Sequence, residues 1–488
     1  MASSLTRTIF KNTAFITAGS LALKVINFLF GVFVVHKLGD ARFGQYATVL
    51  AFVGLFQILA ELGVSQYVMR EIARDRSQAE RLFWNLVSVR ALLALAGIGV
   101  ITWAARLAGY APHLVTGVFL YTCTFLLAAF SAPLEAILTA HERFDYVTGM
   151  TLSAQMTFVT LGAVFLWRGL GYIWLIVASL LSMLLPIAIG VWATRRHGLL
   201  TFRPQVRVRL WPHMIRAGLP FGIISLMLQI AASIDTVMLS RLRTDAEVGW
   251  YNVAYGLIFS LMFLVRGFKT AIVPSLTRAF VDAPHEVERW YYRSVRYIVL
   301  IALPIAAGGM VTAFPLIRLL YGRQFDPAAL GLQILIWDLP FLMFASLCGN
   351  MTTVIGEERA AARIYTINTV ANVALNAMAI PRYGLIGAAF VTVITDFISA
   401  LQFHFLLRRK LHLPGMGRFL LRVGLAAAGM AGLVRLADGL HVVFLLALGA
   451  AAYLLLVLAL RIPDASERQF VSRVRYHVSH MAFRGSDE

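Results

Sequence analysis

The chain is built mainly from continuous runs of about 20 apolar residues, each long enough to cross the hydrocarbon core of a bilayer. The runs do not alternate between apolar and polar residues, which favours helices, because a membrane strand faces lipid only at every second position. Of the 488 residues, 59% are hydrophobic and 14% are charged. A soluble globule needs more polar surface than this. The sequence therefore predicts an all-α polytopic membrane protein with about 14 spanning helices of roughly 20 residues each.

The distribution of Lys and Arg predicts the orientation of these spans. With the N-terminus in the cytoplasm, the inner segments hold most of the 43 Lys and Arg residues, and the outer loops hold few. This is the asymmetry that the positive-inside rule describes, so both termini are expected on the cytoplasmic side of the membrane. The net charge of +19 then indicates topology. Nucleic-acid binding is disfavoured, because the cations are dispersed between the spans.

A seven-residue motif recurs in the first outer loop of each predicted half, as "DARFGQY" around Gly44 and as "DAEVGWY" around Gly249. Six predicted spans separate the copies, which places both on the same face, as a parallel duplication requires. Each motif is expected to form an outer turn, with the glycine providing backbone freedom. Tyr46 and Tyr251 are expected to anchor the following helices at the interface.

This duplication predicts two pseudo-symmetric six-helix lobes, followed by two C-terminal helices. The predicted division is an N-lobe (1–197), a basic cytoplasmic linker (198–213), a C-lobe (214–410), spans 13 and 14 (411–462) and a basic cytoplasmic tail (463–488).

Three blocks carry a family resemblance: "HKLGDARFGQYATVLAF", "SIDTVMLSRLRTDAEVGWYNVAYGL" and "NVALNAMAIPRYGLIGAAFVTVITD". They resemble the polysaccharide transporter branch, with its Wzx-type oligosaccharide flippases, of the multidrug/oligosaccharidyl-lipid/polysaccharide flippase superfamily. The resemblance covers residues 15–410. It implies that the two lobes surround a central cavity and that the membrane is a prokaryotic inner membrane. It implies translocation of a polyprenyl-diphosphate-linked oligosaccharide from the inner to the outer leaflet by alternating access, in polysaccharide or cell-envelope glycan biosynthesis such as that of O-antigen.

Four cations fall within predicted spans. A charge near the bilayer centre costs about 2.5–3.5 kcal/mol on insertion scales, so each one needs a reason. A diphosphate entering from the cytoplasmic leaflet needs cations at this depth. The resemblance implies that cations on the first and eighth helices line the cavity, which selects Lys24 and Arg266. Lys269 and Arg90 are further candidates, and the alternative for Arg90, Arg266 and Lys269 is snorkelling to the inner headgroups.

Acids and amides within the spans are candidates for coupling and for sugar contact. Asp396, Asp338 and Asp235 could bind a proton or sodium ion, and the alternative for Asp396 is a structural hydrogen bond. Asp235 lies near an outer helix end and Glu61 and Glu135 lie near inner ends, so an interfacial charge is the favoured interpretation for these three. Asn368, Asn372 and Asn376 recur every four residues on one helix face. They are expected to pack helices together or to contact a sugar.

Other functions are also compatible with the sequence, and most of them are kinds of transport. A lipid II flippase and a cation-coupled multidrug efflux transporter are alternatives, and a membrane glycosyltransferase or polymerase is disfavoured by the short outer loops. No soluble catalytic motif, P-loop or metal-ligand pattern occurs, so no enzyme activity and no cofactor or metal site is expected, apart from coupling to a proton, sodium or the membrane potential. Expected partners are the lipid-linked glycan, membrane lipids, and the polysaccharide polymerase and glycosyltransferases of the same pathway.

Overall fold

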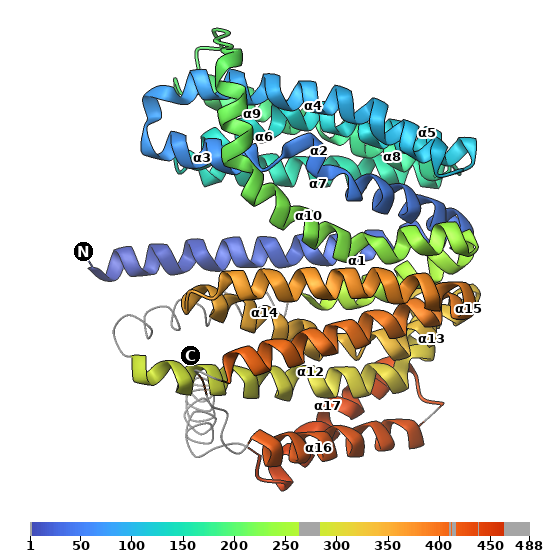
Figure 1. Cartoon of the computed structure of the whole chain (residues 1–488). Coiled ribbons are helices and arrows are strands. Elements are labelled where there is room, and N and C mark those ends of the chain that lie inside the picture. Colours follow the sequence, from blue (N-terminus) through green and yellow to red (C-terminus); the bar gives the residue numbers. More distant parts are fainter. Residues whose placement is uncertain (1, 263–283, 409–410, 412–415, 438, 463–488) are drawn as a thin grey trace, which may run out of the picture. The chain divides into compact units, whose positions relative to one another are not determined.

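The computed structural model describes residues 2–262, 284–408, 411, 416–437 and 439–462. All regular structure in these ranges is helical (Figure 1). Residues 245–262 are also helical. The helices are α1 (Ala2–Leu55), α2 (Gln57–Glu61), α3 (Val64–Arg74), η1 (Arg76–Gln78), α4 (Ala79–Leu107), α5 (Pro112–Thr122), α6 (Thr124–Ala140), α7 (Phe144–Trp167), α8 (Tyr172–Ser182), α9 (Leu184–Arg196), η2 (Val208–Leu210), α10 (Trp211–Leu242), α12 (Pro284–Tyr321), η3 (Arg323–Phe325), α13 (Asp326–Leu335), α14 (Asp338–Val354), α15 (Glu358–Leu407), α16 (Met416–Leu436) and α17 (Val442–Ala459).

Several of these helices are long and apolar enough to span a membrane. Within the described ranges there are eight such helices, or up to ten if each of two bent pairs is one span. The longest helices, α1 and α15, each consist of two helical segments that meet at a turn, at Gly39 (φ 72°) and at Gly384 (φ 55°). Both φ values lie in the left-handed region, which glycine enters at little cost. Part of the eighth predicted span, including Arg266 and Lys269, lies outside the described residues.

The helices form two compact units. Unit 1 comprises Met1–Gly256, Leu320–Pro327 and Tyr365–Val391, and unit 2 comprises Leu257–Leu319, Ala328–Ile364 and Thr392–Glu488. Each unit is described separately below.

Unit 1 has two buried apolar clusters. One joins α1, α4, α5, α7 and α8, and Val49, Ile101 and Leu175 are fully buried in it. The other joins α3, α4, α6, α9 and the start of α10, around Ile72 and Leu86. Since lipid is as apolar as these side chains, close packing and hydrogen bonds rather than hydrophobic burial must hold the helices together.

The basic linker lies along the start of α4. The Glu80 carboxylate accepts hydrogen bonds from the backbone N–H groups of Thr201 (2.6 Å) and Arg203 (2.9 Å). The Asn85 side chain accepts from the backbone N–H of Arg207 (2.8 Å) and donates to the carbonyl of Gln205 (2.9 Å). Two side chains of one helix therefore satisfy the backbone of a segment that has little regular structure of its own.

The two copies of the repeated motif contact each other in unit 1. A Cβ added to Gly44 would overlap the carbonyl oxygen of Asp245 and lie 2.9 Å from the backbone nitrogen of Gly249. A Cβ added to Gly249 would overlap the carbonyl oxygen of Asp40 and lie 3.3 Å from the backbone nitrogen of Gly44. The Gln45 side chain also donates to Asp245 Oδ2 at 2.9 Å. The two glycines thus allow two backbone segments to pack in direct contact. Neither glycine has a positive φ, and the residue with a positive φ before the first motif is Gly39.

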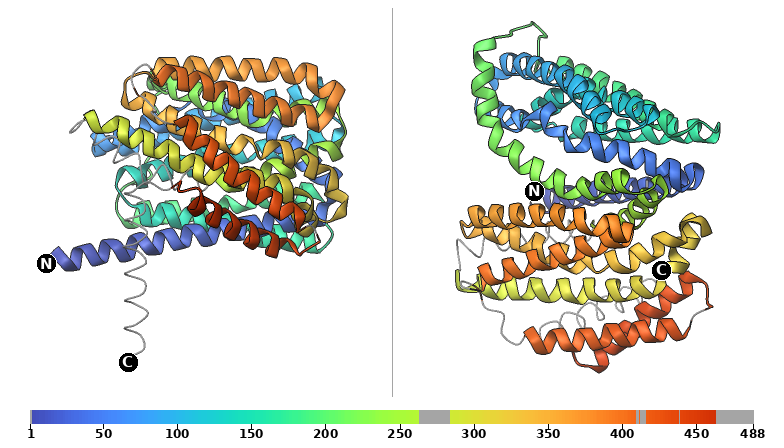
Figure 2. Two further views of the ribbon diagram at one scale, coloured as in Figure 1. Left: turned by 90° about the horizontal axis from the view of Figure 1, so that it is seen from below. Right: turned by 45° about the vertical axis from the view of Figure 1, so that its right-hand side comes forward.

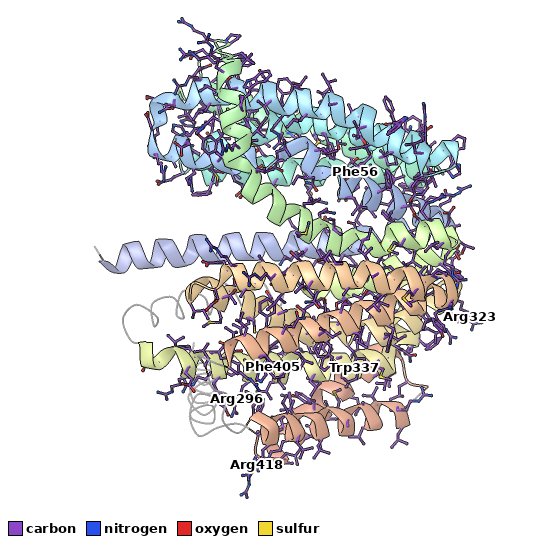
Figure 3. All side chains as sticks on the ribbon, viewed as in Figure 1. Phe56, Arg296, Arg323, Trp337, Phe405 and Arg418 are labelled. Atoms are coloured by element: carbon purple, nitrogen blue, oxygen red, sulfur yellow. The ribbon has the colours of Figure 1, made fainter. Side chains whose placement is uncertain are left out.

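In unit 2, α16 and α17 form a hairpin (Figure 2) that packs on α12 through Ala307, Ala427 and Met430. Arg296 of α12, labelled in Figure 3, is buried. Its guanidinium donates to the carbonyl of Ile462 at 3.2 Å and lies 4.3 Å from the centre of the Phe419 ring. A hydrogen bond and a cation–π contact therefore tie both ends of the hairpin to α12.

Candidate functional site

A buried carboxylate lies at the centre of a polar cluster in unit 1. Asp235 of α10, only 5% exposed, accepts hydrogen bonds from Tyr251 Oη (2.8 Å) and Asn376 Nδ2 (2.7 Å). The same Asn376 amide donates to Asn372 Oδ1 at 3.0 Å. Residues more than 100 positions apart in the chain therefore converge on one ionisable group, which is typical of functional positions in membrane helices.

One oxygen of this cluster has no partner. Asn376 is fully buried, and its Oδ1 atom accepts no hydrogen bond from any described residue. Turning the amide around would place Oδ1 against the Asp235 carboxylate, so the hydrogen bonds support the orientation found. A buried acceptor without a donor is costly and calls for an unseen water or ion. Carboxylate and amide oxygens side by side suit a small hard cation.

The predicted amide stripe contributes to this cluster. Asn368, Asn372 and Asn376 are all less than 10% exposed. Asn376 binds Asp235 directly, and Asn372 is linked to Asp235 through Asn376. Tyr251 also belongs to this cluster. The expectation that it anchors a helix at the interface is wrong, because Tyr251 is 2% exposed and its hydroxyl binds Asp235.

The other two predicted acids meet in unit 2. Asp338, at the first turn of α14, is 1% exposed and interacts electrostatically with Asp396 of α15. Their predicted role in ion coupling stays a prediction.

The four predicted cations have different surroundings. Lys24 lies on an exposed face of α1. Arg90 of α4 is buried, and its Nη1 donates to Ser65 Oγ at 2.6 Å and lies 3.4 Å from Glu61 Oε1. Arg90 thus has partners within unit 1, and its role in diphosphate binding stays a prediction. Arg266 and Lys269 lie outside the described residues.

Glu61 lines a cavity of about 310 Å³ that the sequence analysis did not anticipate. The cavity lies where the chain bends by 51° between α1 and the α2–α3 segment, a place marked by Phe56 in Figure 3. Glu61 was expected to be an interfacial charge, but its carboxylate faces this cavity while pairing with the buried Arg90.

Comparisons with known proteins identify the kind of molecule to which these features belong. Residues 38–330 match the family described as "Polysaccharide biosynthesis protein". The chain belongs to this family. It is 21% identical to the Haloferax volcanii protein named "Probable low-salt glycan biosynthesis flippase Agl15", over 78% of this chain and 80% of that one.

The fold agrees with this membership. The structure is similar to that of the lipid II flippase MurJ in an inward closed conformation, with a TM-score of 0.76 and 14% identity over 92% of this chain and 99% of the other. It is also similar to an inward-facing multidrug resistance MATE family transporter, with a TM-score of 0.65 and 17% identity over 79% and 95% of the two chains. The predicted all-helical polytopic fold is confirmed, and the chain is a multi-pass membrane protein of a transporter family.

Proposed function

We propose that this chain is a flippase that carries a polyprenyl-diphosphate-linked oligosaccharide from the cytoplasmic to the outer leaflet by alternating access. The family membership carries the proposal, since a polysaccharide pathway must move its lipid-linked intermediates across the membrane. The name of the Haloferax volcanii relative, a glycan biosynthesis flippase, supports the same reading.

In this proposal the diphosphate binds to cations in the inner half of the membrane. Lys24 and Arg266 are the main candidates, with Lys269 and Arg90 as further ones. Cationic groups compensate the diphosphate charge as water is lost, while the polyprenyl tail stays in lipid. An efflux pump for cationic drugs needs the opposite charge in its cavity.

The test is transport in proteoliposomes loaded with a fluorescent polyprenyl-diphosphate sugar, with leaflet exposure measured by quenching. The double variant Lys24→Ala/Arg266→Ala should lose transport while its membrane insertion is unchanged. Arg382→Ala, in a predicted outer loop, is the matched control and should transport normally. Normal transport by the double variant would refute the cation site. Transport of a hydrophobic cation in preference to the lipid-linked sugar would refute the flippase function itself.

We further propose that Asp235 couples transport to a cation. The oxygen atoms of Asp235 and the unsatisfied Asn376 Oδ1 support this assignment, because they form a compact set of hard ligands within unit 1. Either a sodium ion or a proton on Asp235 fits that chemistry. Transport that is equally fast with and without proton and sodium gradients would refute the coupling.

A further inference from the structure

The cavity beside Glu61 has a backbone turn as one wall. Leu62 (φ 47°) and Gly63 (φ 70°) are consecutive left-handed residues that break the helix between α2 and α3. A left-handed conformation costs a non-glycine residue such as Leu62 roughly 1 kcal/mol or more. Strain of this kind persists only where surrounding contacts enforce it, and it concentrates at functional sites.

Those contacts come from α10. A Cβ at Gly218 would lie 2.8 Å from both the Leu62 carbonyl oxygen and the Val64 nitrogen, and one at Gly222 would lie 3.0 Å from the Leu62 carbonyl carbon. Two glycines one helical turn apart therefore let α10 pack directly on the broken turn. The cavity opens beside this contact, with Gly222 in its wall.

The polar lining of the cavity consists of three amides and one carboxylate: Gln57, Gln66, Gln229 and Glu61. Gln57 and Gln66 are exposed, and among described residues neither side chain makes a hydrogen bond. Gln229 donates from Nε2 to Ser233 Oγ at 2.8 Å. Its Oε1 atom is an acceptor that this bond does not use.

The electrostatic balance of the cavity selects the class of ligand. The charge of Glu61 is compensated by Arg90 at 3.4 Å, so the ion pair adds no net charge. Glu135 interacts electrostatically with Glu61 but does not line the cavity. A diphosphate needs excess cations, and an acyl or prenyl tail needs apolar walls. Amides that both donate and accept, together with a carboxylate that accepts, instead complement the hydroxyl groups of a sugar.

Size agrees with this chemistry. Small-molecule pockets commonly range over roughly 300–1,000 Å³, and the cavity lies at the lower end, at about 310 Å³. It therefore suits a single ring rather than an extended oligosaccharide. We propose that the cavity between the α2–α3 break and α10 is a glycan subsite that binds one uncharged sugar ring of the transported lipid. This inference rests on the proposed flippase function and adds a second contact point to the cationic diphosphate site.

The test compares the affinities of the purified full chain, in nanodiscs, for defined lipids. The probes are undecaprenyl diphosphate and the same lipid carrying one glucose, galactose, N-acetylglucosamine or N-acetylgalactosamine. In the wild-type chain at least one sugar should strengthen binding. The double variant Gln57→Leu/Gln66→Leu should lose this gain, roughly tenfold to a hundredfold for two hydrogen bonds, while binding the sugar-free lipid as before. Gln333→Leu, a glutamine of α13 in unit 2, is the matched control and should keep the gain.

The outcomes separate the two proposals. A wild-type chain that binds the sugar-free lipid as tightly as all four sugar-bearing lipids overturns the glycan subsite and leaves the flippase function standing. A double variant that retains the sugar-dependent gain also overturns it. A wild-type chain that binds none of the five lipids overturns the flippase function and the subsite together. The single variants Gln57→Leu and Gln66→Leu, each expected to lose part of the gain, provide the same test if the double variant fails to fold.

Discussion

Alanine at Gly44 or Gly249 should destabilise the chain, and the two substitutions should not be additive. At Gly44 the new Cβ would lie 2.8 Å from the Asp245 carbonyl carbon and 2.9 Å from the Gly249 nitrogen. Ordinary carbon contacts begin at about 3.5 Å, so the two backbones must separate by roughly 0.7 Å or more. The obstructing atoms are backbone atoms and cannot rotate away. Overpacking of this kind costs about 1–3 kcal/mol.

Because each glycine faces the backbone of the other motif, the first alanine makes room for the second. Gly44→Ala/Gly249→Ala should therefore cost less than the sum of the single substitutions, with a coupling of about 0.5–3 kcal/mol. Thermal unfolding in detergent measures all three variants. Gly31→Ala, a helical glycine of α1 with no atom within 4 Å of its added Cβ, is the control and should be neutral or slightly stabilising. Strictly additive effects, or single variants as stable as the Gly31→Ala control, would refute the reasoning.

Three further predictions follow from other contacts. Asp235→Asn should abolish the cation dependence of transport without unfolding the chain, because the amide oxygen can still accept the hydrogen bond of the Tyr251 hydroxyl. Glu142→Gln removes an exposed loop carboxylate and is the control. Retained ion dependence in Asp235→Asn would contradict the coupling. Glu61→Leu should lower the thermal unfolding temperature more than Arg90→Leu. Glu61→Leu leaves the Arg90 guanidinium, which is 6% exposed, without its partner, whereas Arg90→Leu leaves the Glu61 carboxylate, which is 36% exposed. An unpaired buried charge costs about 3–5 kcal/mol, and the reverse order of stabilities would contradict this reasoning. Glu80→Ala should free the linker around Thr201 and Arg203, measured as faster cleavage there by added trypsin, whereas unchanged cleavage would show that Glu80 does not hold the segment.

The fold was largely predictable because lipid imposes a simple rule on the chain. Continuous apolar runs must be helices, and the chain turns at Gly39, in a predicted loop, and at Gly384, directly after one. The helical periodicity also placed Asn368, Asn372 and Asn376 on one face, as found. Helical periodicity does not reveal which residue packs against that face, because Asp235 lies 141 residues from Asn376 in the chain.

The site was less predictable because polar residues in a membrane helix look alike in sequence. Arg90 and Glu61 were each assessed alone, as possible snorkelling or interfacial charges, yet they form a pair. Gln57 and Gln66 carry no charge and so gave no signal, although the helix break between them opens a cavity. The recurrence of Gly44 and Gly249 was visible, but backbone freedom was the wrong reason for it, because neither has a positive φ and both allow close approach.

The contact between the repeated motifs has the form of an interface between identical subunits. Gly44 faces residues 245 and 249, and Gly249 faces residues 40 and 44, so equivalent positions exchange roles across the contact. This reciprocity defines an isologous dimer interface, in which one patch binds a second copy of itself. A two-fold homodimer of the ancestral half would have needed only one glycine substitution to acquire this contact, because symmetry places it on both sides. In a single chain the same contact depends on two separate codons, so it constrains both copies of the motif at once.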